Sequence, residues 1–253
     1  MYPEEYGPRL FELLGWEGGR GVKRFEHTAM TEGAPVLSVR DLHFPALPPM
    51  TFDIRRGEIA FLRDENYNTG RRLHECFLGD RGWTSGFFRL NGRLYQPGDL
   101  GRVIGSEIGI QIERPDRPGG VLFDNMTALD NLCTSLIPKA GQHIIRKKIV
   151  SSILSEALRW FPKEMLLQPL SSWSYPERLR FSYYRWYLLN PKLLICFFPF
   201  AGQESAHHKM IIDLLVLCAQ RGMAVWIISS GIDAICEKTD NEEFLRRLHY
   251  LNK

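Results

Sequence analysis

The chain of 253 residues lacks several features that would place it in a special class. Its longest wholly apolar run, from Leu193 to Phe200, is well short of the ~20 residues that a membrane-spanning helix needs. The N-terminus, Met-Tyr-Pro-Glu-Glu, is acidic and has no basic-then-apolar pattern of a signal peptide. The sequence therefore predicts a cytoplasmic protein, which reaches the inner face of a membrane only through a partner.

Cysteine is scarce, and positive charge is not concentrated. The five cysteines include no CxxC pair, and three of them lie in apolar stretches, which indicates buried reduced thiols rather than a disulfide framework or a metal site. The formal net charge is only +3, with Lys and Arg scattered along the chain. We therefore expect no metal and no direct nucleic-acid partner.

The sequence is long enough, and apolar enough at 44% hydrophobic residues, to bury a sizeable core. Residues 1–34 are rich in glycine and predict an N-terminal arm, while residues 35–253 predict one domain. The patterns in the first hundred residues predict a strand–loop–helix unit and antiparallel strands, with Asn91-Gly92 as a hairpin turn. The expected strands cover 36–40, 50–54, 59–62, 87–90 and 93–95, and the expected helix covers 70–78.

The middle and the end of the chain favour helices and then alternating strands and helices. Helices are expected over 127–136, 142–160 and 176–189, within a helical subdomain of approximately 125–190. The remaining expected elements are strands at 192–198 and 223–229, a helix at 204–220 and a short helix from 233. Strands separated by helices predict parallel crossovers. The fold class is α/β, with an antiparallel β subdomain, a parallel core sheet and a helical subdomain.

An aromatic cluster with neighbouring arginines stands out in the third of these helices. Two interpretations stay open: the rings fill the core, or part of the stripe forms a partner surface. The cluster consists of Trp173, Tyr175, Phe181, Tyr183, Tyr184, Trp186 and Tyr187.

The order of these elements, with their turn residues, resembles an ATP-binding cassette (ABC) ATPase over roughly residues 35 to 240. In particular, it resembles the second cassette of ribose- and galactose-type sugar importers. Val36–Leu42 resembles its first strand, and Phe52–Ile59 resembles the strand and turn before the phosphate loop. Asn190–Ile195 resembles the approach to the Walker B strand, and Gly222–Ser230 resembles the final strand. The resemblance implies a P-loop NTPase-like fold.

The segment Asp64–Arg72 stands where the resemblance places the phosphate loop. That loop needs glycines, a Lys for the β/γ-phosphates and a Ser/Thr for Mg²⁺. Here Gly70 stands in place of the Lys, and Arg71 and Arg72 stand in place of the Ser/Thr. Asn66, Gly70, Arg71 and Arg72 are the candidate residues of a degenerate phosphate loop. The two arginines either hold an anion weakly at the helix start or are simply solvated.

The segments that match the Walker B, signature and switch-histidine motifs also depart from the residues that those motifs require. Phe197-Phe198 replaces the Walker B acids before Pro199, and an aromatic ring cannot coordinate Mg²⁺. The signature segment, near Leu170–Glu177, has lost its glycines, and Ser230 or Gly231 stands at the switch histidine. We therefore expect no catalytic residue, no hydrolysis and no cofactor, with ATP binding as the alternative.

The sequence predicts a catalytically inactive ABC-type module that acts through protein contacts in a transporter or regulatory assembly. The expected partner is another cassette, a membrane permease or a fused regulatory domain. One alternative is a nucleotide-binding ATP-binding subunit of a sugar importer, and a second is a domain of a larger signalling or transcription-regulatory protein. The chain stops soon after its Ser-Ser strand, so we expect either a reduced domain or a piece of a longer protein.

The substitution Phe197→Asp tests whether this position lies in the central sheet. It should destabilise the fold by about 3 kcal/mol or more, because a lone carboxylate would lose its hydration in an apolar interior. Thermal unfolding followed by circular dichroism measures the effect. A melting temperature equal to that of the wild type would mean that the position is wrongly assigned to the sheet.

Overall fold

The computed structural model describes residues 33–80, 82–113, 122–140, 147–201 and 205–251. These residues form two compact units, a smaller one within 123–172 and a larger one within 30–122 and 173–253. The expected N-terminal arm lies outside the described residues except for Gly33 and Ala34. The helix of the aromatic cluster, α7 (Tyr175–Leu189), belongs to the larger unit.

The larger unit contains an antiparallel sheet of four strands in the order β2-β1-β4-β5. These strands are β1 (Leu37–His43), β2 (Met50–Ile54), β4 (Ser85–Leu90) and β5 (Arg93–Tyr95). Asn91 and Gly92 join β4 to β5 with φ values of 48° and 77°, as the left-handed backbone of a tight two-residue hairpin requires. The hairpin that the sequence predicts is therefore confirmed.

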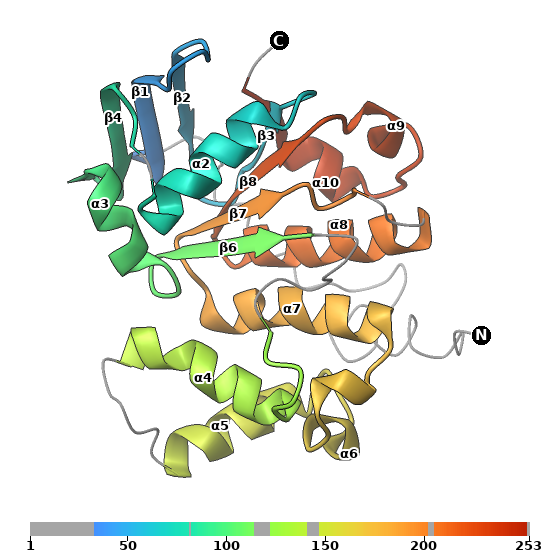
Figure 1. Cartoon of the computed structure of the whole chain (residues 1–253). Helices are drawn as coiled ribbons and strands as arrows, with labels where there is room; N and C mark the ends of the chain where they lie inside the picture. Colours follow the sequence, from blue (N-terminus) through green and yellow to red (C-terminus); the bar gives the residue numbers. More distant parts are fainter. Residues whose placement is uncertain (1–32, 81, 114–121, 141–146, 202–204, 252–253) are drawn as a thin grey trace. The chain divides into compact units, whose positions relative to one another are not determined.

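A five-stranded parallel sheet completes the larger unit, in the order β6-β7-β8-β3-β9 (Figure 1). Its strands are β3 (Ile59–Arg63), β6 (Ile108–Ile112), β7 (Leu193–Phe197), β8 (Ala224–Ser229) and β9 (Leu248–Tyr250). Every residue of β7 and β8 is buried, as expected of parallel strands covered on both faces. The predicted parallel crossovers are confirmed, whereas the short edge strand β9 was not predicted.

Helices connect these strands. The larger unit holds α2 (Asn68–Leu78), α3 (Pro97–Leu100), η1 (Gly101–Val103), α7, α8 (Ser205–Gln220), α9 (Asp233–Cys236) and α10 (Glu242–Arg247). The smaller unit holds α4 (Ala128–Ala140), α5 (Lys147–Ala157), α6 (Lys163–Leu166) and η2 (Leu170–Ser172). Helix α8 packs against α7 and against strands β3 and β8. Among the described residues, no helix is both long and apolar enough to cross a membrane.

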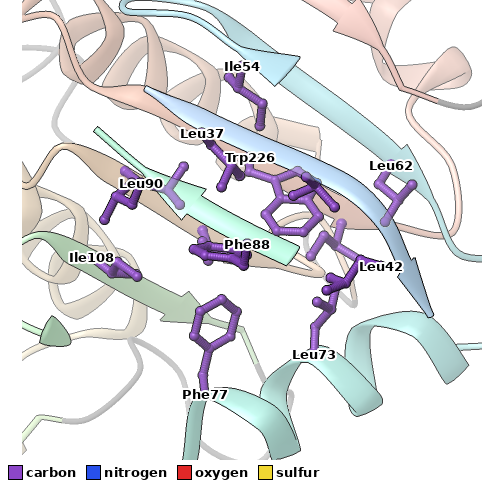
Figure 2. Packing of buried hydrophobic residues seen from close by; sticks show 14 of the residues in the cluster. Leu37, Leu42, Ile54, Leu62, Leu73, Phe77, Phe88, Leu90, Ile108 and Trp226 are labelled. Atoms are coloured by element: carbon purple, nitrogen blue, oxygen red, sulfur yellow. The ribbon is translucent and has the colours of Figure 1, made fainter. Parts of the chain in front are cut away.

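An apolar core joins the two sheets of the larger unit to α2 (Figure 2). Trp226 of β8 is fully buried, and its ring lies 5.1 Å from that of Phe52 of β2, centroid to centroid. Phe77 of α2 meets Phe88 of β4 edge to face, with ring centroids 5.9 Å apart. Such pairs stabilise beyond their buried area, so this core holds the start of α2 at a fixed place beside the sheets.

The aromatic cluster of α7 is mostly interior. Six successive residues, Phe181 to Trp186, are buried, so no face of this stretch is open to solvent. The core interpretation is therefore confirmed for Trp173, Phe181, Tyr183, Tyr184 and Trp186, while Tyr175 and Tyr187 are half-buried. Burial lowers the pKa of Arg185 to about 10, and its guanidinium lies 4.6 Å from the Trp186 ring centroid.

Two side chains organise the start of α4 in the smaller unit. The Thr127 hydroxyl donates to the Asp130 carboxylate at 2.7 Å and accepts the Asp130 N–H at 3.1 Å, so Thr127 caps the helix. The buried Asn131 amide accepts the Phe123 N–H at 2.8 Å and donates to the Phe123 carbonyl at 3.0 Å.

The α5 helix is shorter than the expected 142–160, and residues 141–146 lie outside the described part of the chain.

Three buried cysteines of the larger unit provide a direct test of this packing. Cys76, Cys196 and Cys218 are at most 1% exposed, and burial raises the pKa of both Cys76 and Cys218 to about 12. Because the thiolate is the reactive form, these three should resist a thiol reagent in the native protein at pH 8. Mass spectrometry after timed labelling should find them modified only in denaturant, and rapid native labelling of all three would contradict the fold.

Candidate phosphate-loop site

Three of the four motif positions meet at the carboxyl edge of the parallel sheet. The Asp64 N–H, after β3, donates to the Ser229 carbonyl of β8 at 2.8 Å. The Phe198 N–H, after β7, donates to the Ile228 carbonyl at 2.8 Å. The segments that the sequence resemblance matches to the phosphate loop, the end of the Walker B strand and the approach to the switch histidine are thus neighbours. In open α/β sheets this edge is where ligands bind.

Helix α2 begins in this loop, and its first N–H groups already have an anionic partner. The Asp64 side chain accepts the Thr69 N–H at 3.2 Å and the Gly70 N–H at 2.7 Å. Asp64 is only 5% exposed. A carboxylate on the free N–H groups of a helix start is stabilised both by charge-assisted hydrogen bonds and by the helix dipole. The chain's own carboxylate therefore occupies the anion-binding donors of this helix.

Gly70, which the sequence resemblance matches to the phosphate-loop lysine, is buried and closely packed. A Cβ atom added there would lie 2.8 Å from Cζ of Phe198 and 3.2 Å from Oδ2 of Asp64. It would also lie 3.3 Å from Cγ2 of Ile228. The first distance is shorter than two carbon atoms can approach without displacement. A side chain at position 70 therefore requires the Phe198 ring to move.

Two aromatic residues at the loop have a left-handed backbone. Tyr67, the N-cap of α2, has φ 57°, and Phe198 has φ 52°. Bulky residues rarely adopt this region, and each such position costs of order 1–3 kcal/mol. The two rings are in contact, with centroids 4.6 Å apart and planes tilted by 51°. Their packing, together with the loop's backbone hydrogen bonds, offsets this cost.

The other candidate residues of the loop lie toward solvent. Asn66 and Arg71 are exposed, and the Arg71 N–H already donates to the Tyr67 carbonyl at 3.2 Å. Arg72 forms an ion pair with Glu75 at 3.1 Å. The structure pairs the Thr69 and Gly70 N–H groups beside these arginines with Asp64, so these two donors already have a partner. A partly exposed pair such as Arg72–Glu75 contributes little stability.

The signature segment and the switch position have different local structures. Ser174 caps α7 and exchanges hydrogen bonds with Glu177, whose carboxylate accepts the Ser174 N–H at 2.8 Å. Pro176 follows in the first turn of the helix and has no N–H to donate. Ser230 and Gly231 are exposed after β8. The helix start that stands in for the signature loop is thus capped by its own residues.

A buried polar network beside this edge was not recognised in the sequence. The Gln111 amide of β6 donates to Glu113 at 2.6 Å and to Ser182 at 3.0 Å, and it accepts the Trp186 indole N–H at 2.8 Å. Gln111 and Ser182 are fully buried, and Glu113 is 3% exposed. The network ties β6 to α7. The sequence signal for this network is the presence of polar residues in an otherwise apolar strand, since buried polar groups need hydrogen-bond partners.

Restoring the family's lysine tests the packing of Gly70. We expect Gly70→Lys to destabilise the protein by about 1–3 kcal/mol, because the new side chain overpacks the loop against Phe198. Gly231→Lys is the matched control, since a Cβ at Gly231 meets nothing within 4 Å. Urea unfolding of both variants measures the difference. Equal stability of the two variants would show that the loop is open at position 70.

The chain is similar to ATP-binding proteins of sugar importers, although no family model matches it. One relative, from Pseudomonas syringae pv. tomato, is named for ribose, galactose and methyl galactoside import; it is 25% identical over 90% of this chain and 44% of its own length. The fructose import ATP-binding protein FruK of Bifidobacterium longum is 24% identical over 94% of this chain and 48% of its own. The chain spans less than half the length of these relatives.

Solved structures share the fold. The cassette cbiO1 from Clostridium perfringens has a TM-score of 0.65 and 20% identity, with 86% of this chain and 85% of that chain covered. The dimeric cassette MJ0796 bound to ADP and Pi has a TM-score of 0.59 and 16% identity, with 85% and 94% covered. The chain thus has the P-loop NTPase fold of an ABC ATPase cassette, and its sequence resembles the ATP-binding proteins of sugar importers.

Proposed function

We propose that the chain is a cassette module of a sugar-importer type of assembly, which acts through protein contacts and does not hydrolyse ATP at its own loop. The observation that carries the proposal is the buried Asp64 carboxylate on the first N–H groups of α2. A nucleotide phosphate would need the same donors.

Electrostatics supports this proposal. A phosphate near Thr69 and Gly70 would bring two anions within a few ångströms of each other in a poorly solvated place. Their repulsion is on the order of 4 kcal/mol per unit charge pair at 4 Å and an effective dielectric constant of 20. The loop offers no lysine to offset this cost, and the ion pair with Glu75 reduces the attraction that Arg72 can supply.

The residues at the end of β7 also support the proposal that the chain does not hydrolyse ATP. Hydrolysis by this family needs one acid to hold Mg²⁺ and another to orient water. Phe197 is 1% exposed within the sheet and Phe198 packs on Tyr67, and neither ring has an oxygen for the metal. The residues at this position provide apolar packing and none of the required chemistry.

The proposed partners follow from the comparisons. The structure of cbiO1 is described as part of the transporter complex cbiONQ, and the MJ0796 cassette is dimeric. By analogy, the partner of this chain would be another cassette or a membrane permease, which would hold the chain at the inner face of a membrane. A fused regulatory domain is the remaining partner class.

A second candidate is a nucleotide-binding subunit of a sugar importer. The names of the relatives favour it, since each of those quoted above is an ATP-binding import protein. In this case ATP would have to bind with Asp64 displaced from the α2 start, or through contacts that leave Asp64 in place.

Binding of a fluorescent ATP analogue, with and without Mg²⁺, separates the two candidates. We expect no binding below millimolar nucleotide and no phosphate release above the buffer rate, because the phosphate donors are occupied. Arg71→Ala is the matched variant: weak anion attraction by the exposed guanidinium would disappear in it. Micromolar Mg²⁺-dependent affinity would refute the proposed function and establish the second candidate.

A further inference from the structure

The loop residues Asp64, Tyr67, Gly70 and Phe198, here called the loop-closing cluster, make contacts that depend on one another. The Gly70 N–H donates to Asp64, and the missing Gly70 side chain leaves the space that the tip of the Phe198 ring fills. The Phe198 ring in turn packs on Tyr67. Phe198, at the end of β7, therefore fills the space that a side chain at position 70 of the loop would need.

We infer that the loop-closing cluster is an autoinhibitory contact, in which Asp64 takes the hydrogen-bond donors and Phe198 takes the volume that a bound phosphate and its lysine would use. The altered phosphate loop and the altered Walker B end are then one coupled feature rather than two independent losses. The inference deepens the proposed function and rests on it in one respect, since it explains why nucleotide would be excluded.

The backbone provides an independent argument. Tyr67 and Phe198 both have φ near +50°, which neither a tyrosine nor a phenylalanine adopts without cost. Residues in such conformations persist only where their surroundings hold them. Here both strained residues belong to the same ring pair, at the place where the loop closes. The contact beside the α2 start thus holds two aromatic residues in this conformation.

The steric half of the inference is tested by a double-mutant cycle between positions 70 and 198. In the wild type, Gly70→Ala should lower the melting temperature, because the new methyl group meets Cζ of Phe198. In the Phe198→Gly background the same change should raise the melting temperature, because alanine favours a helix over glycine. An effect of equal sign and size in both backgrounds would overturn the coupling. Phe198→Asn, which also tolerates a left-handed backbone, serves if Phe198→Gly does not fold.

The electrostatic half is tested at the two amides that Asp64 accepts. In the wild type, the amide hydrogens of Thr69 and Gly70 should exchange slowly, and Asp64→Ala should speed their exchange at least tenfold. Glu65→Ala is the matched control. It removes the same charge from the same loop, but Glu65 is exposed and lies 3.7 Å from Arg63 in an exposed ion pair. Asp64→Asn, which keeps one acceptor oxygen, should be intermediate.

Inorganic phosphate, added to the same samples, shows whether the contact is inhibitory. We expect phosphate to shift the Thr69 and Gly70 amide signals in the Asp64→Ala/Phe198→Gly variant and to leave them unchanged in the wild type and in Glu65→Ala. No shift in the double variant, or equal shifts in all samples, would overturn the inference. ATP binding by the wild type would refute the proposed function and this inference together, whereas a double variant that does not respond to phosphate, beside a wild type that binds no nucleotide, overturns the inference alone, so the two failures are distinguishable.

Discussion

The contact between one buried carboxylate and the start of one helix determines the geometry of the candidate site. Asp64 receives the N–H groups of Thr69 and Gly70, which fixes where α2 begins and how tightly the preceding loop turns. Without this acceptor, two helix donors would lie in a largely buried place with no partner, which costs about 1–3 kcal/mol for each group. The close packing of Gly70 against Phe198 depends on the same position of the helix.

The two sheets provide the rigid frame for this contact. Asp64 is anchored through its N–H to the end of β8, and Phe198 is anchored through its own N–H one residue earlier on the same strand. The apolar core around Trp226 and Phe88 holds α2 against both sheets. A fold stabilised in this way does not depend on which residues stand at the sheet edge, so the frame can be retained whatever chemistry that edge carries.

Much of the fold could be predicted from the sequence, because its signals are local. The turn at Asn91-Gly92, the fully apolar strands β7 and β8 and the proline-started helix α7 each depend on a few neighbouring residues. Strand β9 was missed because it is short and gains its place from pairing with β3, which is distant in sequence.

The candidate site was harder to predict than the fold. The sequence showed that the loop lacks a lysine and that Asp64 adds negative charge there. It did not show that the Asp64 carboxylate turns inward onto α2, or that Phe198 fills the space beside Gly70. Both facts depend on three-dimensional packing between β3, α2 and β7, and no periodicity in the chain encodes it. Gln111 was overlooked for the same reason, since its partners Ser182 and Trp186 come from a different element.

The position of β3 within the parallel sheet also has a consequence for the order of folding. This strand lies between β8 and β9, and both are synthesised long after it. During translation, therefore, β3 is synthesised before its two neighbouring strands. Its apolar residues, such as Phe61 and Leu62, which are buried in the folded protein, are then exposed to solvent. Non-local parallel pairing of this kind folds slowly and leaves strand edges open to other chains in the meantime. The half-made chain thus presents an unpaired β3 until β8 and β9 have been synthesised.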